Sequence, residues 1–182
     1  MSSLGRDGSA LLVIDVQNGV VEGAHKLEQT LAAINSSIDK ARAAGIPVIW
    51  VQHSDEDLAI DSEAWQIVDE LHHDASEPHI RKIYPSSFED TPLESILEDL
   101  GIGHLYICGA QSNNCVRHTG HSATERGYDL TLISDAHTTT GFEWNGYKVD
   151  AASAIDEQNT NFMGRNLPGR SVRAIPAAEV SF

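Results

Sequence analysis

Short runs of almost wholly apolar residues recur along this chain, and stretches with helical periodicity separate them. Residues 10–14, 48–51, 105–108 and 130–133 form four such runs. None alternates apolar and polar residues in the way a half-exposed strand does, so each is expected to be buried on both faces. Strands of this kind, alternating with helices, predict an α/β fold in which helices cover both faces of a parallel sheet.

The helical stretches have recognisable ends. Apolar residues recur every three or four positions over 27–41, and Gly45 and Pro47 then end that helix. The sequence Thr-Pro-Leu-Glu at 91–94 has the pattern of a capping box with proline at the first helical position. Further helices are predicted at 64–71 (capped by Ser62), 116–126 and 149–158, and further strands at 80–84 and 172–175.

Length and charge exclude several classes of protein. The 182 residues contain no internal repeat or linker, which predicts one domain over 1–182. A formal net charge of −15 argues against nucleic acid or an anionic membrane as a partner, because both require a basic surface. No stretch approaches the roughly 20 apolar residues of a membrane span, and residues 1–7 lack a signal-peptide pattern, so a cytoplasmic location is expected.

The chain has two cysteines, Cys108 and Cys115, which are too few for a disulfide framework and are expected to stay reduced. Cys115 ends the segment GAQSNNC, which follows an apolar run and precedes a predicted helix. Backbone N–H groups at a helix start favour negative charge, so they lower the pKa of a nearby thiol and can bind an oxyanion. The position of Cys115 therefore predicts a nucleophile.

Two other reactive side chains fall at strand ends. Asp15 follows the first apolar run, and Lys82 lies in the short strand predicted at 80–84. Ligands of open parallel sheets bind beyond the carboxyl ends of the strands, where these residues would lie with Cys115. Each residue alone has a plainer explanation, as a helix cap, a solvated charge or a small buried side chain. Together they predict a reactive site.

Three segments carry a resemblance to a known family: LVIDVQ at 12–17, KIYPSSF at 82–88 and CGAQSNNCV at 108–116. In order and spacing they resemble the isochorismatase-like cysteine hydrolases, which include nicotinamidases and N-carbamoylsarcosine amidase. The resemblance covers nearly the whole chain. It implies a Rossmann-like three-layer sandwich with a six-stranded parallel sheet, hydrolysis without a cofactor, and a homodimer or homotetramer.

The same resemblance implies roles for individual residues. Asp15, Lys82 and Cys115 would form a catalytic triad, and a cis peptide before Gln111 would aim the backbone N–H groups of Gln111 and Cys115 at an oxyanion. Lys82 and the helix start would hold Cys115 as a thiolate, and Asp15 would transfer protons during formation and hydrolysis of a thioester.

The resemblance is compatible with several classes of substrate. A small amide, a carbamoyl or ureido compound, or a lactam of the streptothricin type would each suit a cysteine nucleophile. Isochorismatases proper cleave a vinyl ether and lack this cysteine, so Cys115 argues against that reaction. The alternatives are a redox-sensing or ligand-binding protein in which Cys115 is oxidised, and a purely structural flavodoxin-like module. The presence of both Asp15 and Lys82 favours hydrolysis, because a sensor needs no proton shuttle.

No metal is expected. The nicotinamidases of the family hold a metal with an Asp-x-His pair beside the second strand, and residues 52–57 lack that spacing. His53 with Asp55 or Asp57 nevertheless leaves a metal-assisted nicotinamidase as an open alternative.

Substrate contacts are expected from Gln17, Trp65, Tyr84 and Phe88, with core packing as the alternative for the aromatic residues. The loop 136–148 is expected either to cover the site or to join a subunit contact. Loop hydrogen bonds are expected for Asp135 and His137, which follow the fifth predicted strand. Surface positions are expected for His72, His73 and His118.

Overall fold

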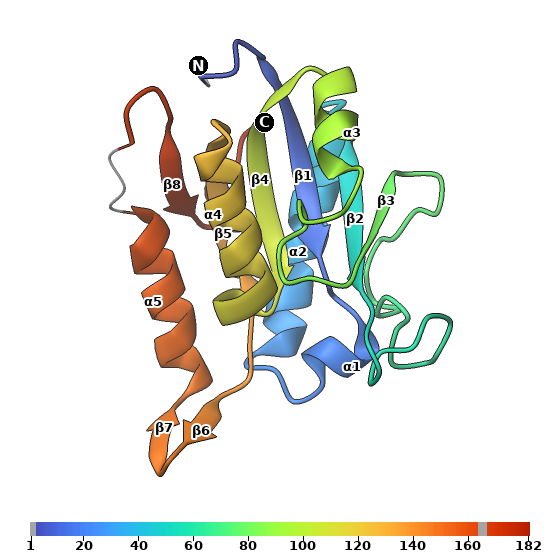
Figure 1. Ribbon diagram of the computed structural model, residues 1–182, viewed down its shortest axis with the longest axis vertical. Coiled ribbons are helices and arrows are strands. Elements are labelled where there is room, and N and C mark those ends of the chain that lie inside the picture. The colour runs from blue at the N-terminus through green and yellow to red at the C-terminus, as the bar shows by residue number, and fades with distance from the viewer. Residues whose placement is uncertain (1–2, 164–166) are drawn as a thin grey trace.

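A computed structural model describes residues 3–163 and 167–182, and its centre is a six-stranded parallel sheet (Figure 1). The strand order is β3-β2-β1-β4-β5-β8, which is the doubly wound arrangement that the sequence predicted. No helix within the described residues is long and apolar enough to cross a membrane. The strands of this sheet are β1 (Gly8–Ile14), β2 (Val48–His53), β3 (His79–Lys82), β4 (Ile102–Ala110), β5 (Asp129–Thr138) and β8 (Val172–Ile175).

Helices cover both faces of the sheet, and a short antiparallel hairpin of β6 (Phe142–Trp144) and β7 (Tyr147–Val149) extends beyond it (Figure 1). Helix α2 packs on one face, whereas α3, α4 and α5 pack on the other. The helical segments are α1 (Asn18–Val21), α2 (Leu27–Ala43), α3 (Leu93–Asp99), the π-helical turn η1 (Ser112–Val116), α4 (Arg117–Glu125), α5 (Ala151–Met163) and the 3-10 turn η2 (Ala177–Glu179).

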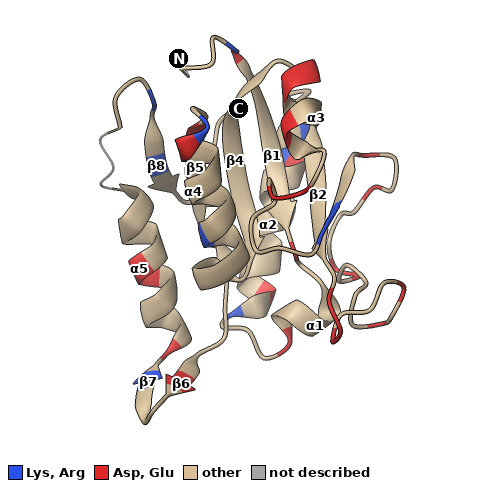
Figure 2. Ribbon diagram, viewed as in Figure 1, with Lys and Arg blue, Asp and Glu red and all other residues tan. Residues whose placement is uncertain are grey.

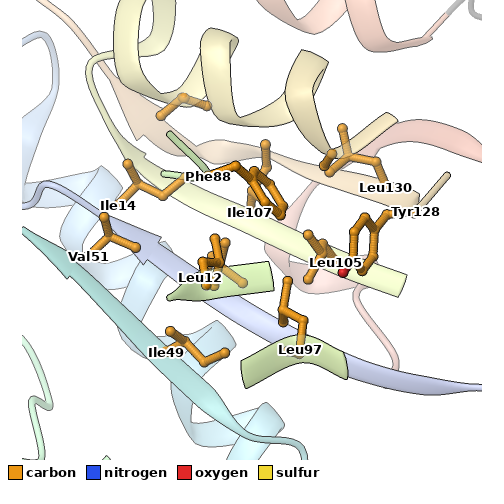
Figure 3. Packing of buried hydrophobic residues seen from close by; sticks show 14 of the residues in the cluster. Leu12, Ile14, Ile49, Val51, Phe88, Leu97, Leu105, Ile107, Tyr128 and Leu130 are labelled. Atoms are coloured by element: carbon orange, nitrogen blue, oxygen red, sulfur yellow. The ribbon is translucent and has the colours of Figure 1, made fainter. Parts of the chain in front are cut away.

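The core consists of two layers because successive side chains of a strand point to opposite faces. Leu12 and Ile14 of β1 pack beneath α3 and α4, while Leu11 and Val13 pack against α2. All four side chains are at most 1% exposed. Figure 3 shows the first of these layers. The continuous apolar runs of the sequence are thus explained by burial on both sides.

The strand order reverses between β1 and β4, and the two strands approach closely there. Ile14 is in register with Gly109, whose φ is +119°. A Cβ atom at Gly109 would overlap the backbone carbonyl of Ile14. Glycine is therefore required at this position, both for its backbone conformation and for the contact that sets β4 beside the end of β1.

The helix predicted at 64–71 is wrong, because this segment is an extended loop. Ser62 does accept a hydrogen bond from the Trp65 backbone N–H at 3.2 Å, but the turn is not continued. Its backbone groups bind the segment after β1 instead, with Asn18 donating to the Gln66 carbonyl at 2.9 Å and Val68 donating to Val16 at 3.2 Å. Hydrogen bonds to a distant segment have replaced those of a helix.

The capping box predicted at 91–94 is also not formed. Helix α3 begins at Leu93, with Pro92 one residue before it, and the Glu94 carboxylate accepts a hydrogen bond from the Tyr128 hydroxyl at 2.8 Å. Leu93 and Leu97 are fully buried as expected, but Leu100 is 48% exposed. The Glu94 side chain therefore bonds to Tyr128, a residue far away in sequence, and not to the backbone N–H that a capping box requires.

Candidate active site

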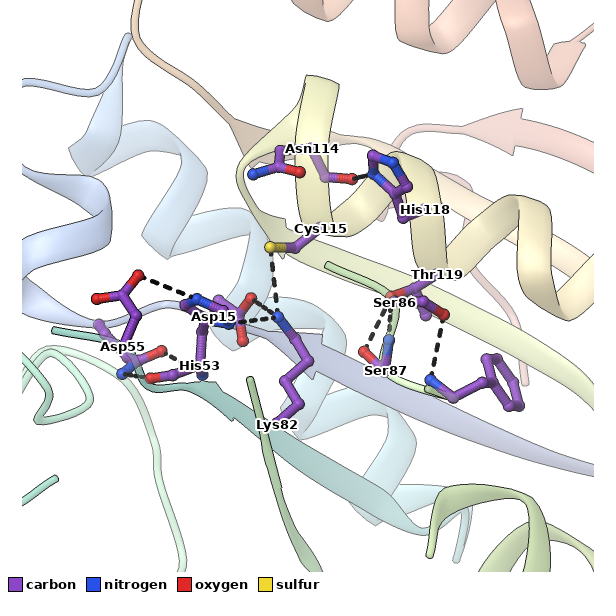
Figure 4. Close-up of polar contacts among 12 residues, drawn as sticks. Asp15, His53, Asp55, Lys82, Ser86, Ser87, Asn114, Cys115, His118 and Thr119 are labelled. Carbon is purple, nitrogen blue, oxygen red and sulfur yellow. Dashed lines mark hydrogen bonds and ion pairs between the residues drawn. The ribbon is translucent and has the colours of Figure 1, made fainter. Parts of the chain in front are cut away.

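Asp15, Lys82 and Cys115 meet beyond the carboxyl ends of β1, β3 and β4, as Figure 4 shows. The Lys82 Nζ lies 2.6 Å from Asp15 Oδ2 and donates a hydrogen bond to Cys115 Sγ at 3.3 Å. Asp15 is 0%, Lys82 2% and Cys115 7% exposed. The structure thus brings together the three residues that the sequence singled out, and it does so in a buried position.

Local backbone structure directs each of the three side chains. Asp15 leaves β1 with a φ of +49°, a conformation that Asp adopts more readily than most residues, while its N–H donates to the Val51 carbonyl at 2.9 Å. Lys82 occupies an inward position of β3, where burial alternates along the strand. Cys115 lies in η1, directly after the loop that leaves β4 at the point where strand order reverses.

The predicted lowering of the Cys115 pKa is wrong for this geometry. Burial raises the pKa of the Cys115 thiol to about 12, and the nearby Asp15 carboxylate adds to the rise, whereas Lys82 opposes it. Burial likewise raises the pKa of Asp15, and Lys82 again acts in the opposite direction. At rest the sulfur is therefore a protonated thiol, because desolvation outweighs the single neighbouring cation.

A cavity of about 430 Å³ opens onto the Cys115 sulfur. Its lining combines the reactive groups with an aliphatic wall, which is the usual composition of a small-molecule site. The lining residues are Asp15, Gly19, Val20, His53, Asp55, Leu58, Ile83, Pro85, Gln111, Asn114 and Cys115.

His53 connects the buried triad to the mouth of this cavity. Its Nδ1 lies 3.4 Å from Lys82 Nζ, and its Nε2 lies 3.2 Å from Asp55 Oδ2. Because Lys82 carries only donors, Nδ1 is the acceptor in the contact with Lys82, and Nε2–H donates to Asp55. The described residues include no group of three or more His, Cys, Asp or Glu side chains arranged to hold a metal ion, and Asp57 contacts Asp55 only through its backbone N–H.

The loop between β4 and Cys115 contains a cis peptide between Ala110 and Gln111, as the resemblance implied. Gln111 borders the cavity, and its side chain donates to the Val20 carbonyl at 3.3 Å. Asn113 accepts a hydrogen bond from the Thr139 hydroxyl at 2.7 Å. Side-chain contacts on both sides thus fix the loop that carries the sulfur.

A buried chain of hydrogen bonds holds Ser112, the residue after Gln111. The Ser112 hydroxyl lies 2.7 Å from His137 Nδ1, and His137 Nε2 lies 3.0 Å from Asn159 Oδ1. Asn159 donates its amide to the Ser134 carbonyl, so His137 must donate from Nε2 and accept from Ser112 at Nδ1. Burial lowers the pKa of His137, which keeps the ring neutral.

The register of the sheet explains why His137 reaches this loop. Ile107 and Gly109 of β4 face Leu132 and His137 of β5, so the one residue between the first pair lies opposite four residues of β5. The bulge returns His137 to the level of Gly109. His137 was expected in a loop after the fifth strand, but it lies within β5. Its hydrogen bond to Ser112 was not predicted from the sequence.

Gln17 does not contact the cavity. Its side-chain amide donates to the carbonyls of His53 and Trp65, both at 2.9 Å, and its Oε1 accepts from the His53 N–H at 2.8 Å. It is 0% exposed. The expected substrate contact is therefore wrong, since Gln17 instead joins the end of β2 to the 64–71 loop.

The three aromatic residues expected to contact substrate also lie away from the described lining of the cavity. Trp65 is 6% exposed, and its ring is covered by the Arg81 guanidinium at 5.4 Å. Phe88 belongs to the core beneath α4, 5.8 Å from the Tyr128 ring. Tyr84 is 39% exposed and lies between two residues that do line the cavity. Core packing explains the positions of Trp65 and Phe88, and Tyr84 lies at the surface.

The remaining expectations concern the surface. Most of the 136–148 loop belongs to the end of β5 and the β6–β7 hairpin, where Phe142, Trp144 and Tyr147 are 48–73% exposed and do not line the cavity. Asp135 accepts a hydrogen bond from the Ala177 N–H at 2.7 Å, but it lies within β5 and not in a loop after the fifth strand. His72, His73 and His118 are exposed, as expected. His73 also contacts the Trp50 and His79 rings, and neither His72 nor His73 lies in a helix.

The fold and the geometry define a doubly wound α/β protein whose cysteine-centred site lies where the strand order reverses. The family model described as "Isochorismatase domain" matches residues 9–160, and the chain therefore belongs to the isochorismatase family of hydrolases.

Individual relatives agree with this assignment. Streptothricin hydrolase of Streptomyces noursei is 33% identical over 158 residues, which cover 84% of this chain and 60% of that protein, so the chain spans less than two thirds of that relative. Ureidoacrylate amidohydrolase RutB of Enterobacter sp. (strain 638) is 26% identical, with 75% of this chain and 77% of that protein covered. A crystal structure of an isochorismatase from Pseudomonas putida KT2440 has a TM-score of 0.84 at 27% identity, covering 95% of this chain and 90% of the other.

Proposed function

We propose that this hydrolase cleaves a C–N bond of a small amide, a carbamoyl or ureido compound, or a lactam through a thioester on Cys115. The observation that carries the proposal is the mutual contact of Asp15, Lys82 and Cys115 at the floor of the cavity. The names of the two relatives, a streptothricin hydrolase and an ureidoacrylate amidohydrolase, support this reaction class.

In the first half of the reaction Asp15 acts as the base. It takes the proton of the Cys115 thiol while sulfur bonds to the carbonyl carbon, and Lys82 stabilises the negative charge that develops on sulfur. Asp15 then gives this proton to the leaving nitrogen and the C–N bond breaks. With an amide or ureido compound an amine or ammonia departs from the acyl-enzyme, whereas with a lactam the freed amine remains attached to the acyl group. A resting thiol suits this sequence, because its proton is the one that the leaving group receives.

In the second half water completes the hydrolysis. Asp15 takes a proton from water as the water oxygen bonds to the thioester carbon, and the C–S bond breaks with return of that proton to sulfur. The products are a carboxylic or carbamic acid and the regenerated thiol. We assign the oxyanion in both halves to the backbone N–H groups of Gln111 and Cys115, since loss of one such donor typically slows a reaction about 10²–10³-fold.

The raised pKa of Cys115 favours hydrolysis over redox sensing. A sensor cysteine reacts as a thiolate, and burial suppresses the thiolate here. A hydrolase can tolerate a high resting pKa because Asp15 removes the proton only when a substrate is in place.

The test is release of ammonia or amine from a panel of small amides and ureido acids, and ring opening of lactams, without added metal. We expect activity in the wild type, loss of at least about 10³-fold in Cys115→Ala, and near wild-type rates in the matched control Cys108→Ala. Intact-mass spectrometry should detect an acyl adduct on the wild type during turnover. Equal activity in wild type and Cys115→Ala would exclude the thioester mechanism.

A further inference from the structure

Asp55 is the charged group that the cavity presents to a bound molecule. Its side chain is 48% exposed, whereas the triad carboxylate Asp15 is fully buried and paired with Lys82. Neither Lys nor Arg occurs among the described residues that line the cavity. A substrate that reaches Cys115 therefore passes one half-exposed carboxylate and no half-exposed cation.

The carboxylate of Asp55 is fixed in place before any substrate arrives. Its Oδ1 accepts the backbone N–H groups of Asp57 at 2.9 Å and Leu58 at 2.8 Å, and its Oδ2 lies 3.2 Å from His53 Nε2. These bonds lower the pKa of Asp55, so it is ionised at neutral pH.

Asp55 is also near the reacting sulfur. A series of three contacts of 3.2–3.4 Å connects Asp55 to Cys115 (Figure 4). The contacts run from Asp55 to His53, from His53 to Lys82 and from Lys82 to the Cys115 sulfur. The cavity lining also includes the aliphatic side chains of Val20 and Leu58. A small molecule of a few carbon atoms can therefore place one end on the sulfur and the other beside the carboxylate.

We propose that Asp55 selects cationic substrates: small amides that carry an ammonium or similar cation a few aliphatic carbons from the scissile carbonyl. This inference rests on the proposed function for its substrate class, but the charge preference at Cys115 can be tested whether or not an amide is hydrolysed. Glu56 and Asp57, which follow Asp55 in the same loop, are exposed and add to the attraction.

The charge preference can be measured without a substrate. Methanethiosulfonates of similar size transfer a thioalkyl group to Cys115 and release methanesulfinate, and they exist as trimethylammonium, neutral and sulfonate forms. We expect the ratio of cationic to anionic labelling rates at Cys115 to exceed that of a free thiol by about tenfold. In Asp55→Asn that excess should fall by about fivefold, as loss of one nearby charge predicts.

The matched control is Glu125→Gln, which removes the same charge from an exposed residue at the far end of α4. It should leave the labelling ratio within twofold of wild type. A ratio that is unchanged in Asp55→Asn, or that falls equally in both variants, would overturn the proposal. Peptide mass spectrometry separates labelling of Cys115 from that of the buried Cys108.

Hydrolysis provides a second, separate readout. The amides 4-aminobutyramide, pentanamide and succinamate are near-isosteric and carry positive, zero and negative charge. We expect kcat/KM to decrease in that order and Asp55→Asn to reduce the differences. If no amide is hydrolysed while labelling still favours the cation, the proposed reaction fails and the charge preference stands. If amides are hydrolysed without charge preference, the proposed reaction stands and the charge preference fails.

Discussion

The thiol of Cys115 shows how burial can change the chemistry expected from sequence. A cation and a helix start beside a cysteine predict a thiolate, but both Asp15 and the cysteine are almost completely removed from water. Desolvation then determines the protonation state, and in the proposed mechanism the proton remains on sulfur until Asp15 removes it. Under that mechanism the reactivity of Cys115 depends on Asp15 and not on the free thiol.

This protonation state has a measurable consequence for alkylation by iodoacetamide. With the Cys115 pKa raised to about 12, the thiolate fraction rises with pH throughout the range 7–10, so the rate at Cys115 should increase about tenfold per pH unit without a plateau. In the guanidinium-unfolded chain the rate should level off above about pH 9, because an ordinary thiol has a pKa near 8.5. A plateau at or below pH 8.5 in the folded protein would show that Cys115 is an activated thiolate.

At the scale of elements, the turn between β4 and α4 determines the site. Gly109 permits the close approach to β1, and the bulge in β5 delivers His137 to Ser112. The hydroxyl of Ser112 is thereby held beside Gln111, whose N–H is one of the two proposed oxyanion donors. A change at His137 should act through this loop, since His137 itself does not line the cavity.

Paired substitutions test this positioning role. Ser112→Ala removes the hydroxyl and should lower kcat about tenfold or more with little change in KM, because a displaced oxyanion donor weakens the transition state more than the ground state. Ser112→Thr retains the hydroxyl and should stay near wild type. His137→Asn can still accept from Ser112, so it should retain more activity than His137→Leu.

Steady-state kinetics and thermal unfolding on the same four variants distinguish the two possible roles. A fall in Tm with kcat unchanged in Ser112→Ala would show that the hydrogen bond supports only the fold.

At the scale of the whole molecule, charge is the dominant feature. A formal net charge of −15 on 182 residues produces self-repulsion in the folded state, and isolated surface ion pairs offset little of it. Acidic side chains are spread over the helices and the long loops (Figure 2).

Added sodium chloride should therefore stabilise the protein at pH 7.5. Raising the salt from about 10 to 300 mM shortens the Debye length from ~30 to ~6 Å and should raise Tm by about 3 °C, which corresponds to about 1 kcal/mol for a chain of this size. At pH 5, close to the isoelectric point of about 4.8, the effect should disappear. Calorimetry that finds no increase at pH 7.5 would contradict the role of charge repulsion.

The homodimer or homotetramer expected from the resemblance remains a prediction at this scale. The exposed aromatic residues of the β6–β7 hairpin, Phe142, Trp144 and Tyr147, are the part of the 136–148 loop through which a second copy would make contact. Sedimentation velocity at micromolar concentration tests the expectation, and a monomer of 19.7 kDa would refute it.

The sequence by itself determined the strands, most helices and the identity of Asp15, Lys82 and Cys115. Apolar periodicity is a local property, and the carboxyl ends of parallel strands must meet at one edge, so these features follow from order along the chain. Three of the wrong predictions share one cause. The helix at 64–71, the capping box and the role of Gln17 were each decided by hydrogen bonds to residues far away in sequence.

Only the tertiary structure decided the protonation of Cys115, the cavity and its half-exposed carboxylate, and the hydrogen bond between Ser112 and His137. Each depends on how much water is excluded from a group or on which partner the folded chain places beside it. Neither quantity is encoded within a short window of sequence. Local pattern selects the residues that can react, and packing sets the charge with which they do so.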